Sequence, residues 1–411
     1  MNRKIRKAAI IGGGPAGAIV AGVLARSGVE VAIIANRKRP PLIVGESLVP
    51  AVIPLLRELG VEDEVASFGK YKPGATFFPT PNEELTYPFS EVRTSLPKYA
   101  YNVPRLQFDD ALLQGALKAG ATLVEANASL EKVGTDEVRL SEETTAAANG
   151  FSPDIIIDGT GRTRQLGRLL DVPSERGERN DSAIFAHLDK SEIAREGNIH
   201  IDRLYRGWSW RIPLRDRVSI GIVIDSEHLK AHGGSAEEQF DAMLRNDPIL
   251  AKITAGATRL SPVMRYSNYQ LITHRACGAN WAMVGDAMGF IDPIFSSGTY
   301  LALDGGFRLA SAILDGSDVA MARYERQQLA HLQHWRTIIS SFYDGRFLTM
   351  LRHGHEMRAT AIGRLFNPHL RRHLGRIFIG SAASRRYSRV LLRFMSTQGI
   401  RRRDHRVLRI N

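Results

Sequence analysis

The stretch KAAIIGGGPAGAIVAGVLAR, residues 7–26, decides the fold. Residues 7–11 form a short apolar run, which predicts a buried strand. A glycine-rich turn follows, and the small residues from Pro15 to Arg26 predict a helix. VEVAIIA, residues 29–35, then predicts a second buried strand. The order of strand, helix and strand predicts a βαβ unit at the beginning of an α/β fold.

The turn between the first strand and the helix has the pattern G-x-G-x-x-G, formed by Gly12, Gly14 and Gly17. Glycines at these positions permit a tight turn, close approach of backbone N–H groups to a pyrophosphate, and close packing of the helix on the strand. The N-terminus of the helix adds a positive potential that attracts phosphate. The pattern therefore predicts that Gly12, Gly14, Ala16 and Gly17 bind a dinucleotide.

The end of the second predicted strand lacks the acidic residue that normally binds the ribose of a dinucleotide. Ala35 stands at this point, followed by Asn36. The Asn36 amide can hydrogen-bond a ribose hydroxyl, but more weakly than a carboxylate does. We therefore expect Asn36 to contact the cofactor and the cofactor to be held loosely.

The composition is that of an ordinary globular protein, with 44% hydrophobic and 24% charged residues among 411. No uncharged apolar run reaches the roughly 18 residues that a membrane span requires. Cys277 is the single cysteine, so it cannot form an internal disulfide, and a thiolate metal cluster is excluded. These features predict a cytoplasmic protein without a metal site.

Four further stretches resemble the FAD enzymes that are built like p-hydroxybenzoate hydroxylase. They are GESLVP at 45–50, PRLQFDDALL at 104–113, DGTGR at 158–162 and GDAMGFIDP at 285–293. The resemblance implies that the dinucleotide is FAD, that Asp286 binds its ribityl chain, that Arg105 lies along it, and that Asp158 belongs to a second fingerprint. It also assigns cofactor contacts to Glu46, Ser47 and Gly289.

Three more stretches narrow the resemblance to the FAD-dependent halogenases, which act on tryptophan, phenol or pyrrole groups. WSWRIP at 208–213 fits W-x-W-x-I-P, FIDPIFSSG at 290–298 fits F-x-x-P-x-x-S-x-G, and KPGATF at 72–77 follows GESLVP at the spacing of that family. The match extends over roughly residues 8–315. The resemblance implies a separate flavin reductase and a halide ion, chloride or bromide, as a further reactant.

The halogenase resemblance assigns roles to individual residues. Trp208 and Trp210 would form a barrier between the flavin and the substrate, so that halide is oxidised instead of the substrate being hydroxylated. Lys72 would hold and activate the oxidised halogen, because a lysine presents several N–H donors on a long stem. The amides of Ser297 and Gly298, at a helix N-terminus, would bind halide, and Ser296 would be catalytic. The alternatives are a surface lysine at 72 and tryptophans that merely fill the core.

The residue before the first serine of the last motif is Phe295, whereas family members that act on free tryptophan have glutamate there. The resemblance therefore favours a phenol or pyrrole substrate, either free or tethered to a carrier protein, in a biosynthetic reaction. Three alternatives stay open: an FAD monooxygenase that hydroxylates an aromatic group, also on a partner protein or peptide; a flavin reductase of isoprenoid chains; and a non-enzymatic flavin-binding protein.

The resemblance also predicts how the chain is divided. We expect a Rossmann-like FAD-binding domain with an inserted antiparallel-sheet substrate subdomain and a helical C-terminal segment. Residues 182–225 and 259–273 alternate as in a partly exposed sheet, helical patterning dominates from about Leu301, and residues 399–411 are expected to be a loose end. The predicted boundaries are 1–180 and 274–320 for the FAD-binding domain, with 70–105 contributing to the substrate side, 181–273 for the substrate subdomain, and 321–411 for the arginine-rich C-terminal segment.

The positive charge is concentrated at the C-terminal end. Residues 352–411 hold 15 arginines, no lysine and two acidic residues, which gives +13 where the whole chain carries +12. RRYSRVLLRF at 385–394 has apolar residues at helical spacing, and it predicts a basic amphipathic helix. Three partners stay open for this helix: an acidic carrier or client protein, an anionic membrane surface, which is less favoured, and the protein's own body. Nucleic acid is excluded because no recognition motif accompanies the charge. The arginines that would steer an acidic partner are Arg385, Arg386, Arg389 and Arg393.

Overall fold

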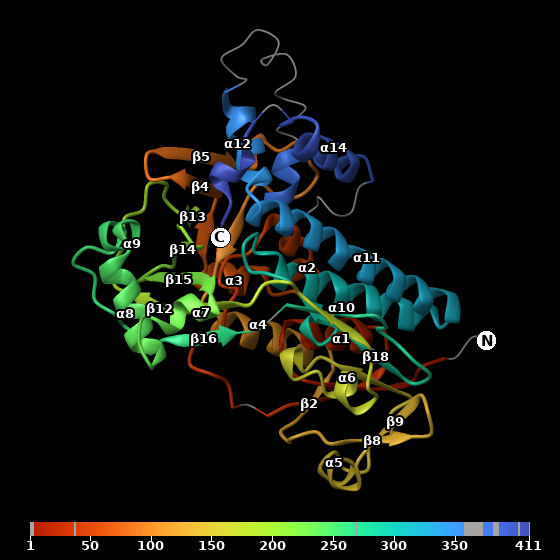
Figure 1. The fold of residues 1–411 in the computed structure, drawn as a ribbon. Helices are drawn as coiled ribbons and strands as arrows, with labels where there is room; N and C mark the ends of the chain where they lie inside the picture. The colour runs from red at the N-terminus through yellow and green to blue at the C-terminus, as the bar shows by residue number, and fades with distance from the viewer. Residues whose placement is uncertain are drawn as a thin grey trace.

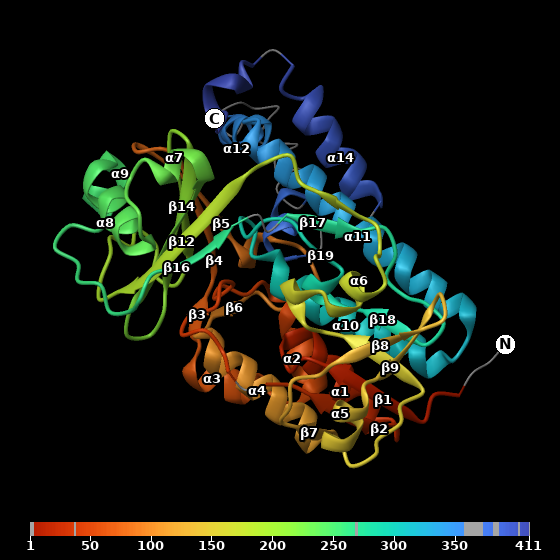
Figure 2. The ribbon, with the colours of Figure 1, turned by 60° about the horizontal axis from the view of Figure 1, so that its bottom comes forward.

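Two large sheets and a set of C-terminal helices dominate the computed structural model of the chain, and three smaller sheets of two or three strands accompany them in the described residues (Figure 1). Figure 2 shows the molecule turned so that its bottom comes forward, with the part that holds α1 (Pro15–Arg26), α4 (Arg105–Lys118) and α10 (Ser297–Asp315) beside the second sheet. The predicted fold class is confirmed, whereas the exact domain boundaries stay a prediction. The structure describes residues 4–36, 38–267, 270–356, 373–380, 386–401 and 403–410.

The first sheet has five strands in the order β18-β10-β1-β2-β7, and all neighbouring strands are parallel. Apart from the edge strand β7, its strands are short and almost entirely buried, as expected of a parallel sheet that is covered on both faces. The predicted βαβ unit is present at its centre. The bounds are β1 Lys7–Ile11, β2 Glu30–Ile34, β7 Thr122–Val124, β10 Ile155–Asp158 and β18 Trp281–Met283.

Helix α1 (Pro15–Arg26) packs between α4 (Arg105–Lys118) and α10 (Ser297–Asp315). Glycines allow α1 to lie close to both neighbouring helices. A Cβ atom added at Gly22 would meet the Leu59 side chain at 2.3 Å and the Ala116 Cα at 3.5 Å, and one added at Gly306 would lie 2.8 Å from the Ala16 carbonyl oxygen. The small-residue composition of α1 therefore serves helix packing as well as the glycine turn.

The second sheet has seven strands in the order β16-β12-β15-β14-β13-β4-β5. Its neighbours are antiparallel except for β13 and β4, which are parallel. Strands β4 and β5 come from residues 74–88, far from the rest of the sheet in sequence. The bounds are β4 Gly74–Thr80, β5 Glu83–Pro88, β12 Asp181–Leu188, β13 Ile199–Arg203, β14 Gly207–Pro213, β15 Val218–Asp225 and β16 Met264–Ser267.

The expectation of a partly exposed sheet is wrong for residues 182–225, whereas β16, in the second stretch of 259–273, is partly exposed. Every residue of β12 and β14 is buried. Three helices that were not expected cover one face, namely α7 (Ser226–Lys230), α8 (Ala236–Asn246) and α9 (Pro248–Ile253). They form a core of their own with that face of the sheet, in which Phe240 and Ile220 are fully buried. The alternation in sequence reflects two different buried environments, and not one buried and one solvated face.

The C-terminal part is helical, as predicted, with α11 (Asp318–Tyr343), α12 (Arg346–Glu356), a helical turn at 373–378 and α14 (Arg386–Thr397). Helix α14 covers the predicted basic amphipathic segment. Tyr387, Val390 and Phe394 are exposed on it, and Arg393 is exposed as well. Arg385 and the side chains of Arg386 and Arg389 lie outside the described residues.

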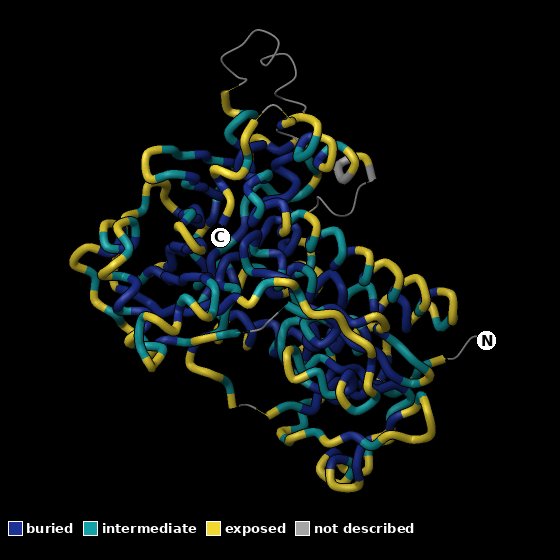
Figure 3. The backbone as a smooth tube through the Cα atoms, in the orientation of Figure 1, coloured by how far each residue is buried: buried dark blue, intermediate teal, exposed yellow. Residues whose placement is uncertain are grey.

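The expectation of a loose C-terminal end is wrong for residues 403–410. Leu408 and Ile410 are buried, and the Ile410 N–H donates to the Tyr343 carbonyl at 2.9 Å. The Arg203 guanidinium, on β13, donates to the carbonyl oxygens of Val407, Leu408 and Arg409. This segment returns to the middle of the molecule in the view of Figure 1, where the C-terminus lies. Figure 3 colours residues by burial, and in this segment only Leu408 and Ile410 are buried among the described residues.

Among the described residues, no helix is long and apolar enough to cross a membrane.

Short elements complete the fold. The remaining bounds are η1 Pro50–Val52, α2 Ile53–Leu59, α3 Glu62–Phe68, β3 Lys70–Lys72, η2 Phe89–Glu91, β6 Ala100–Asn102, β8 Leu130–Val133, β9 Glu137–Leu140, α5 Glu142–Ala147, η3 Gly161–Thr163, α6 Gln165–Leu169, β11 Ser174–Arg176, β17 Leu271–Thr273, η4 Gly285–Ala287, β19 Gly289–Phe290 and η6 His405–Leu408.

Candidate active site

A cavity of about 810 Å³ lies where the carboxyl ends of the parallel strands face the second sheet. This is the edge at which open α/β sheets bind their ligands. Most of the residues predicted from the sequence line it, and four do not. The lining includes Gly12, Gly14, Ala16, Asn36, Glu46, Ser47, Arg105, Trp208, Trp210, Asp286, Ser296 and Gly298, whereas Gly17, Lys72, Gly289 and Ser297 lie outside it.

The glycine turn has the geometry that its sequence predicts. Gly12 has φ of +106°, and a Cβ atom there would lie 2.5 Å from the Gly159 carbonyl oxygen. A Cβ atom at Gly17 would lie 2.1 Å from the Gly12 carbonyl oxygen, so this glycine is needed for packing inside the turn. Around Gly14 no atom lies within 4 Å of such a Cβ atom. Because Gly14 lines the cavity, the open space beside it can take a pyrophosphate.

Asn36 lines the cavity, but its amide already has partners. Its Nδ2 donates to Asn127 Oδ1 at 2.9 Å, and its Oδ1 accepts the Lys38 N–H at 2.8 Å. No carboxylate stands at the end of β2. The end of β2 therefore offers the cavity an amide whose hydrogen-bonding groups already have partners, and its contact with a ribose stays a prediction.

Arg105 is the centre of an ionic group at the base of the cavity. Its Nε donates to Asp109 Oδ1 at 3.0 Å, and its Nη1 donates to the Val44 carbonyl. Burial raises the pKa of Asp286 to about 6, against the opposite effect of the Arg105 and Arg162 charges. Gly289 lies behind this group, in β19, and pairs with Ile272 of β17.

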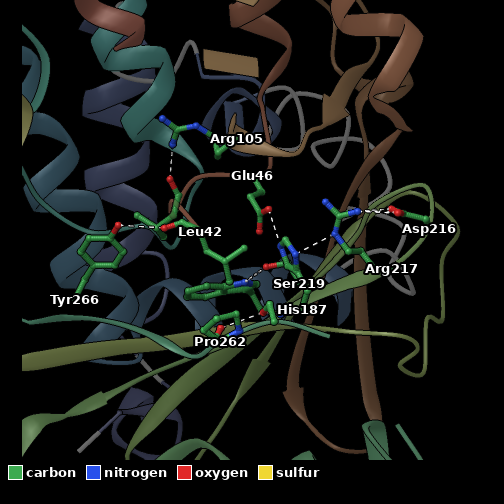
Figure 4. A network of polar contacts seen from close by, with 12 residues as sticks. Leu42, Glu46, Arg105, His187, Asp216, Arg217, Ser219, Pro262 and Tyr266 are labelled. Carbon is green, nitrogen blue, oxygen red and sulfur yellow. Dashed lines mark hydrogen bonds and ion pairs between the residues drawn. The ribbon is translucent and has the colours of Figure 1, made fainter. Parts of the chain in front are cut away.

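Glu46 is held in the cavity by a chain of polar contacts that reaches the surface (Figure 4). His187 Nε2 lies 2.8 Å from Glu46 Oε1, and Arg217 Nε donates to His187 Nδ1 at 2.9 Å. Arginine has only donors, so His187 Nδ1 must accept and Nε2 must carry the hydrogen. The imidazole is therefore neutral and donates to Glu46, while Arg217 pairs with Asp216 at 2.7 Å.

The N-terminus of α10 faces the cavity. Ser296, its N-cap, has φ of +54° and makes no side-chain capping bond, and Ser297 is buried behind it. Gly298 lines the cavity, where a Cβ atom would lie 3.0 Å from the Phe290 ring. The first N–H groups of a helix have no acceptor within the helix and carry positive potential. This end of α10 can therefore bind a small anion.

Trp208, Trp210 and Ile212 form one wall of the cavity, because alternate residues of β14 point to the same side. The two indole rings lie 5.8 Å apart. Trp210 Nε1 donates to Ser219 Oγ at 3.2 Å, and a Cβ atom at Gly221 would lie 2.0 Å from the Trp210 ring. Both rings are thus fixed in place.

Trp208 is anchored to the C-terminal helices. Its Nε1 donates to Tyr343 Oη at 3.0 Å, and Tyr343 in turn donates to Asp292 Oδ2 at 2.7 Å. Burial raises the pKa of Asp292 to about 7. The tryptophan wall, the FIDPIF stretch and the end of α11 are therefore joined by one buried chain of hydrogen bonds.

Lys72 is buried, with 2% of its surface exposed, so the alternative of a surface lysine is wrong. Its Nζ donates to the Leu48 carbonyl at 2.7 Å and lies 5.6 Å from the centre of the Phe89 ring. Among the described residues, Lys72 forms no ion pair with a carboxylate. Burial lowers the pKa of its amine to about 7.

A second cavity, of about 1070 Å³, lies on the other side of η1. Ser47 lines the first cavity, Leu48 accepts the Lys72 hydrogen bond, and Ala51 lines the second cavity. Leu48 and Ala51 are three residues apart, a span of at most about 11 Å. Lys72 therefore contacts the short segment that separates the two cavities. Helix α10 also divides them, because Gly298 and Tyr300 face different cavities.

Phe295 belongs to a cluster of aromatic side chains next to this segment. Its ring contacts Trp335, Phe342, Phe347 and Phe378, with centroids 5.0 to 6.4 Å apart. A glutamate at this position would place an unpaired charge among four rings, so the apolar residue fits its surroundings.

Sequence reasoning missed His187, Arg217, Asp292 and Tyr343. His187 and Arg217 lie on β12 and the turn before β15, in a stretch of ordinary strand residues that carried no signal. Asp292 could have been predicted as a site residue, since it lies inside the FIDPIFSSG motif. Its partner Tyr343 is 51 residues away, and no local pattern connects the two residues.

The parallel sheet, the glycine turn and the cavity at its edge define a dinucleotide-binding protein. Residues 6–158 match the FAD binding domain family, and residues 84–346 match the tryptophan halogenase family. The chain belongs to the tryptophan halogenase family and is an FAD-dependent oxidoreductase.

Individual relatives agree with this assignment. The chain is 29% identical over 360 residues to tryptophan 2-halogenase of Chondromyces crocatus, which covers 82% of this chain and 68% of that protein. It is 27% identical over 372 residues to the 1H-pyrrole-2-carbonyl-(peptidyl-carrier protein) chlorinase of Pseudomonas fluorescens, covering 81% and 82%. The solved flavin-dependent brominase Bmp2 has the same fold, with a TM-score of 0.79, 22% identity, and 96% and 99% of the chains covered.

Proposed function

We propose that the protein halogenates an electron-rich aryl group of the phenol or pyrrole type, using reduced FAD, O₂ and chloride or bromide. The observation that carries this proposal is a buried amine, that of Lys72, which donates to the Leu48 carbonyl in the segment between the FAD cavity and a second cavity large enough for an aryl substrate. A hydroxylating monooxygenase would need its substrate beside the flavin and would have no use for this amine.

The residues of the first cavity fit FAD. Its pyrophosphate would lie at Gly12, Gly14 and the N-terminus of α1, and Arg105 and Asp286 would flank its ribityl chain. Bound in its reduced form, FAD supplies the electrons with which O₂ oxidises halide to an electrophilic halogen. The balanced reaction consumes reduced FAD, O₂, halide, a proton and the aryl C–H, and it yields FAD, the aryl halide and two molecules of water.

Halide would bind at the N-terminus of α10, where Gly298 lines the cavity and Ser297 follows the left-handed Ser296. The tryptophan wall would keep the substrate away from the flavin. Lys72 would then hold the oxidised halogen through an N–H of its amine. Because its pKa is lowered to about 7, the amine is present in both protonation states at neutral pH and can give or take a proton at Nζ.

The nature of the substrate is proposed from Phe295 and from the relatives. The described side chains in contact with the Phe295 ring are aromatic, so they include no carboxylate that could assist the deprotonation of an indole substrate. One relative is named as a chlorinase of a pyrrole on a peptidyl-carrier protein, which supports a tethered substrate here. An acidic carrier would suit the basic segment that includes the exposed Arg393. We also propose that a separate flavin reductase supplies reduced FAD.

The first test is a product mass. The protein, supplied with chemically reduced FAD, O₂ and bromide, is expected to brominate members of a panel of phenols and pyrroles without NADPH. The panel includes free acids and the same acyl groups as thioesters on a carrier protein, and mass spectrometry detects a gain of bromine in place of hydrogen. A gain of one oxygen instead would establish the monooxygenase, and turnover only with NADPH bound by this chain would exclude the two-component reaction.

A second test concerns the anchoring of Trp208. In Tyr343→Phe the indole loses its acceptor and Asp292 loses its donor. We expect the fraction of reduced FAD that is oxidised without product to rise several-fold, because the wall becomes mobile. Leaving Asp292 without this partner should also lower stability by about 1–3 kcal/mol.

The measurement is aryl halide formed per FAD oxidised, together with hydrogen peroxide. Tyr205→Phe is the matched control, since Tyr205 is 70% exposed. A lower melting temperature with an unchanged product yield would show that Tyr343 serves only packing.

A further inference from the structure

Four arginines line a crevice of about 440 Å³ that is continuous with the FAD cavity. They are Arg162, Arg164, Arg168 and Arg176, on η3, α6 and β11 and the turns between them. The crevice and the FAD cavity share Thr163, Arg168, Asp286 and Phe290 as lining residues.

Within the described residues, none of these four arginines is locked into an ion pair, although the Asp286 and Asp158 charges act on Arg162 and Arg164. Arg162 instead donates to the Ser267 carbonyl at 2.8 Å and stacks 5.0 Å above the Tyr266 ring, which lines the FAD cavity. Among the described residues that line the crevice, Asp286 is the only acid.

Arg164 is built into the crevice in an unusual way. It has φ of +51°, and its Nε donates to the Ala287 carbonyl at 3.3 Å. Its Nη2 is buried and, among the described residues, has no hydrogen-bond partner. Burial and the nearby Arg168 charge lower the pKa of Arg164, against the effect of Asp158. A buried guanidinium N–H without an acceptor costs free energy unless a ligand supplies one.

We propose that this crevice captures the pyrophosphate of a dinucleotide flavin, so that reduced FAD from solution is guided into the adjoining cavity. Guanidinium groups present planar pairs of N–H donors that match phosphate oxygens. Four arginines together supply more N–H donors than a single halide ion can accept, so the crevice suits a larger anion with several oxygens. The weak ribose contact predicted at Asn36 fits a cofactor that is taken up and released in each cycle. The inference rests on the proposed function, in which reduced FAD comes from a separate reductase.

The test measures how fast reduced FAD associates with the full chain under anaerobic conditions, over a series of salt concentrations. Arg162→Gln/Arg176→Gln is the informative variant, because both side chains are exposed and neither lines the FAD cavity. We expect its association rate constant to fall about tenfold at low salt, within the range of electrostatic steering. The difference should vanish near 1 M salt, where charges are screened within about 3 Å.

Two controls separate capture from other effects. Riboflavin lacks the pyrophosphate, so its association should not change. Arg206→Gln/Arg245→Gln removes the same charge from exposed arginines of the other sheet and its helices, and reduced FAD should associate with that variant at the normal rate. An unchanged rate in the crevice variant, an equal fall for riboflavin, or a change confined to dissociation would overturn the proposal.

NADPH is the other dinucleotide with this chemistry, and it forms a separate arm of the experiment. If NADPH binds the wild type and the crevice variant weakens that binding while FAD association is unchanged, the crevice serves a nicotinamide cofactor and the proposal fails. The proposed function is tested separately by single-turnover halogenation with wild-type protein to which reduced FAD is already bound, because this reaction does not depend on the capture of FAD from solution. If the loaded wild-type protein forms no aryl halide, the proposed halogenase activity fails, whatever the association rate constants are.

Discussion

Lys72→Met is expected to lower the rate of aryl halide formation by about a thousandfold, while reduced FAD is still reoxidised at nearly the normal rate. The amine lies outside the FAD cavity and contacts the segment that separates it from the second cavity. Its loss should therefore leave the flavin chemistry intact and remove the group that holds and activates the oxidised halogen. A positioned acid or base commonly contributes about 10²–10⁴-fold to a rate. Rapid-mixing absorbance of the flavin and chromatography of the product measure the two rates separately.

Lys70→Met is the matched control for this substitution. Lys70 belongs to the same short strand, but its side chain is 31% exposed and pairs with Glu196. We expect normal product formation in this variant. Product formation that survives in Lys72→Met would show that the buried amine has only a structural role.

Lys72→Met is also expected to raise the stability of the folded protein, although it lowers the activity. The pKa of Lys72 is about 7 in the folded protein and near 10.5 when the amine is exposed. Between these values the unfolded chain binds the proton and the folded chain does not, so stability rises with pH through this window. Below pH 7 the cost of burying the charge is fully present. Methionine removes that cost, so the variant should be more stable by a few kcal/mol at pH 6 and by less at pH 10. Denaturant unfolding at both pH values measures this difference and shows that the variant is folded.

The fold was predictable where local pattern and global structure agree. The run of residues 7–35 predicts its strand, helix and strand without help from the rest of the chain, and the structure has all three. Helix α8 was also readable, because Ser235 and Glu238 form a capping box ahead of the apolar Phe240 and Met243.

Other features depend on contacts between distant parts of the chain, and no local pattern reveals them. The end of the chain is rich in arginine and looks solvated, but Arg203 binds the carbonyls of residues 407–409 from about 200 positions away. Lys72 lies in a three-residue strand beside another lysine, and its burial follows from the Leu48 carbonyl and the Phe89 ring. The motif could single out Lys72, whereas only the packing shows that it is buried.

Gly14→Val is expected to weaken FAD binding at least about a hundredfold without unfolding the protein, a loss of about 2.8 kcal/mol. A Cβ atom at Gly14 meets no protein atom within 4 Å, and the backbone there is extended, with φ of −79° and ψ of −178°. Valine can adopt this conformation without strain. Its side chain would occupy the part of the cavity where backbone N–H groups approach the pyrophosphate. Titration with FAD, followed by flavin fluorescence, gives the affinity, and the melting temperature of the apoprotein should stay the same.

Gly17→Val should fail in a different way, and the contrast tests the assignment of the turn. Its Cβ atom would lie 2.1 Å from the Gly12 carbonyl oxygen, so the turn itself must move. Overpacking of this kind costs about 1–3 kcal/mol, and the melting temperature should fall together with FAD affinity. Gly234→Val, where the nearest atom is Glu238 Oε2 at 3.6 Å, should change neither property. If Gly14→Val binds FAD as tightly as the wild type, the pyrophosphate does not lie on this turn, and the positions inferred for Arg105, Asp286 and the halide must then be revised with it.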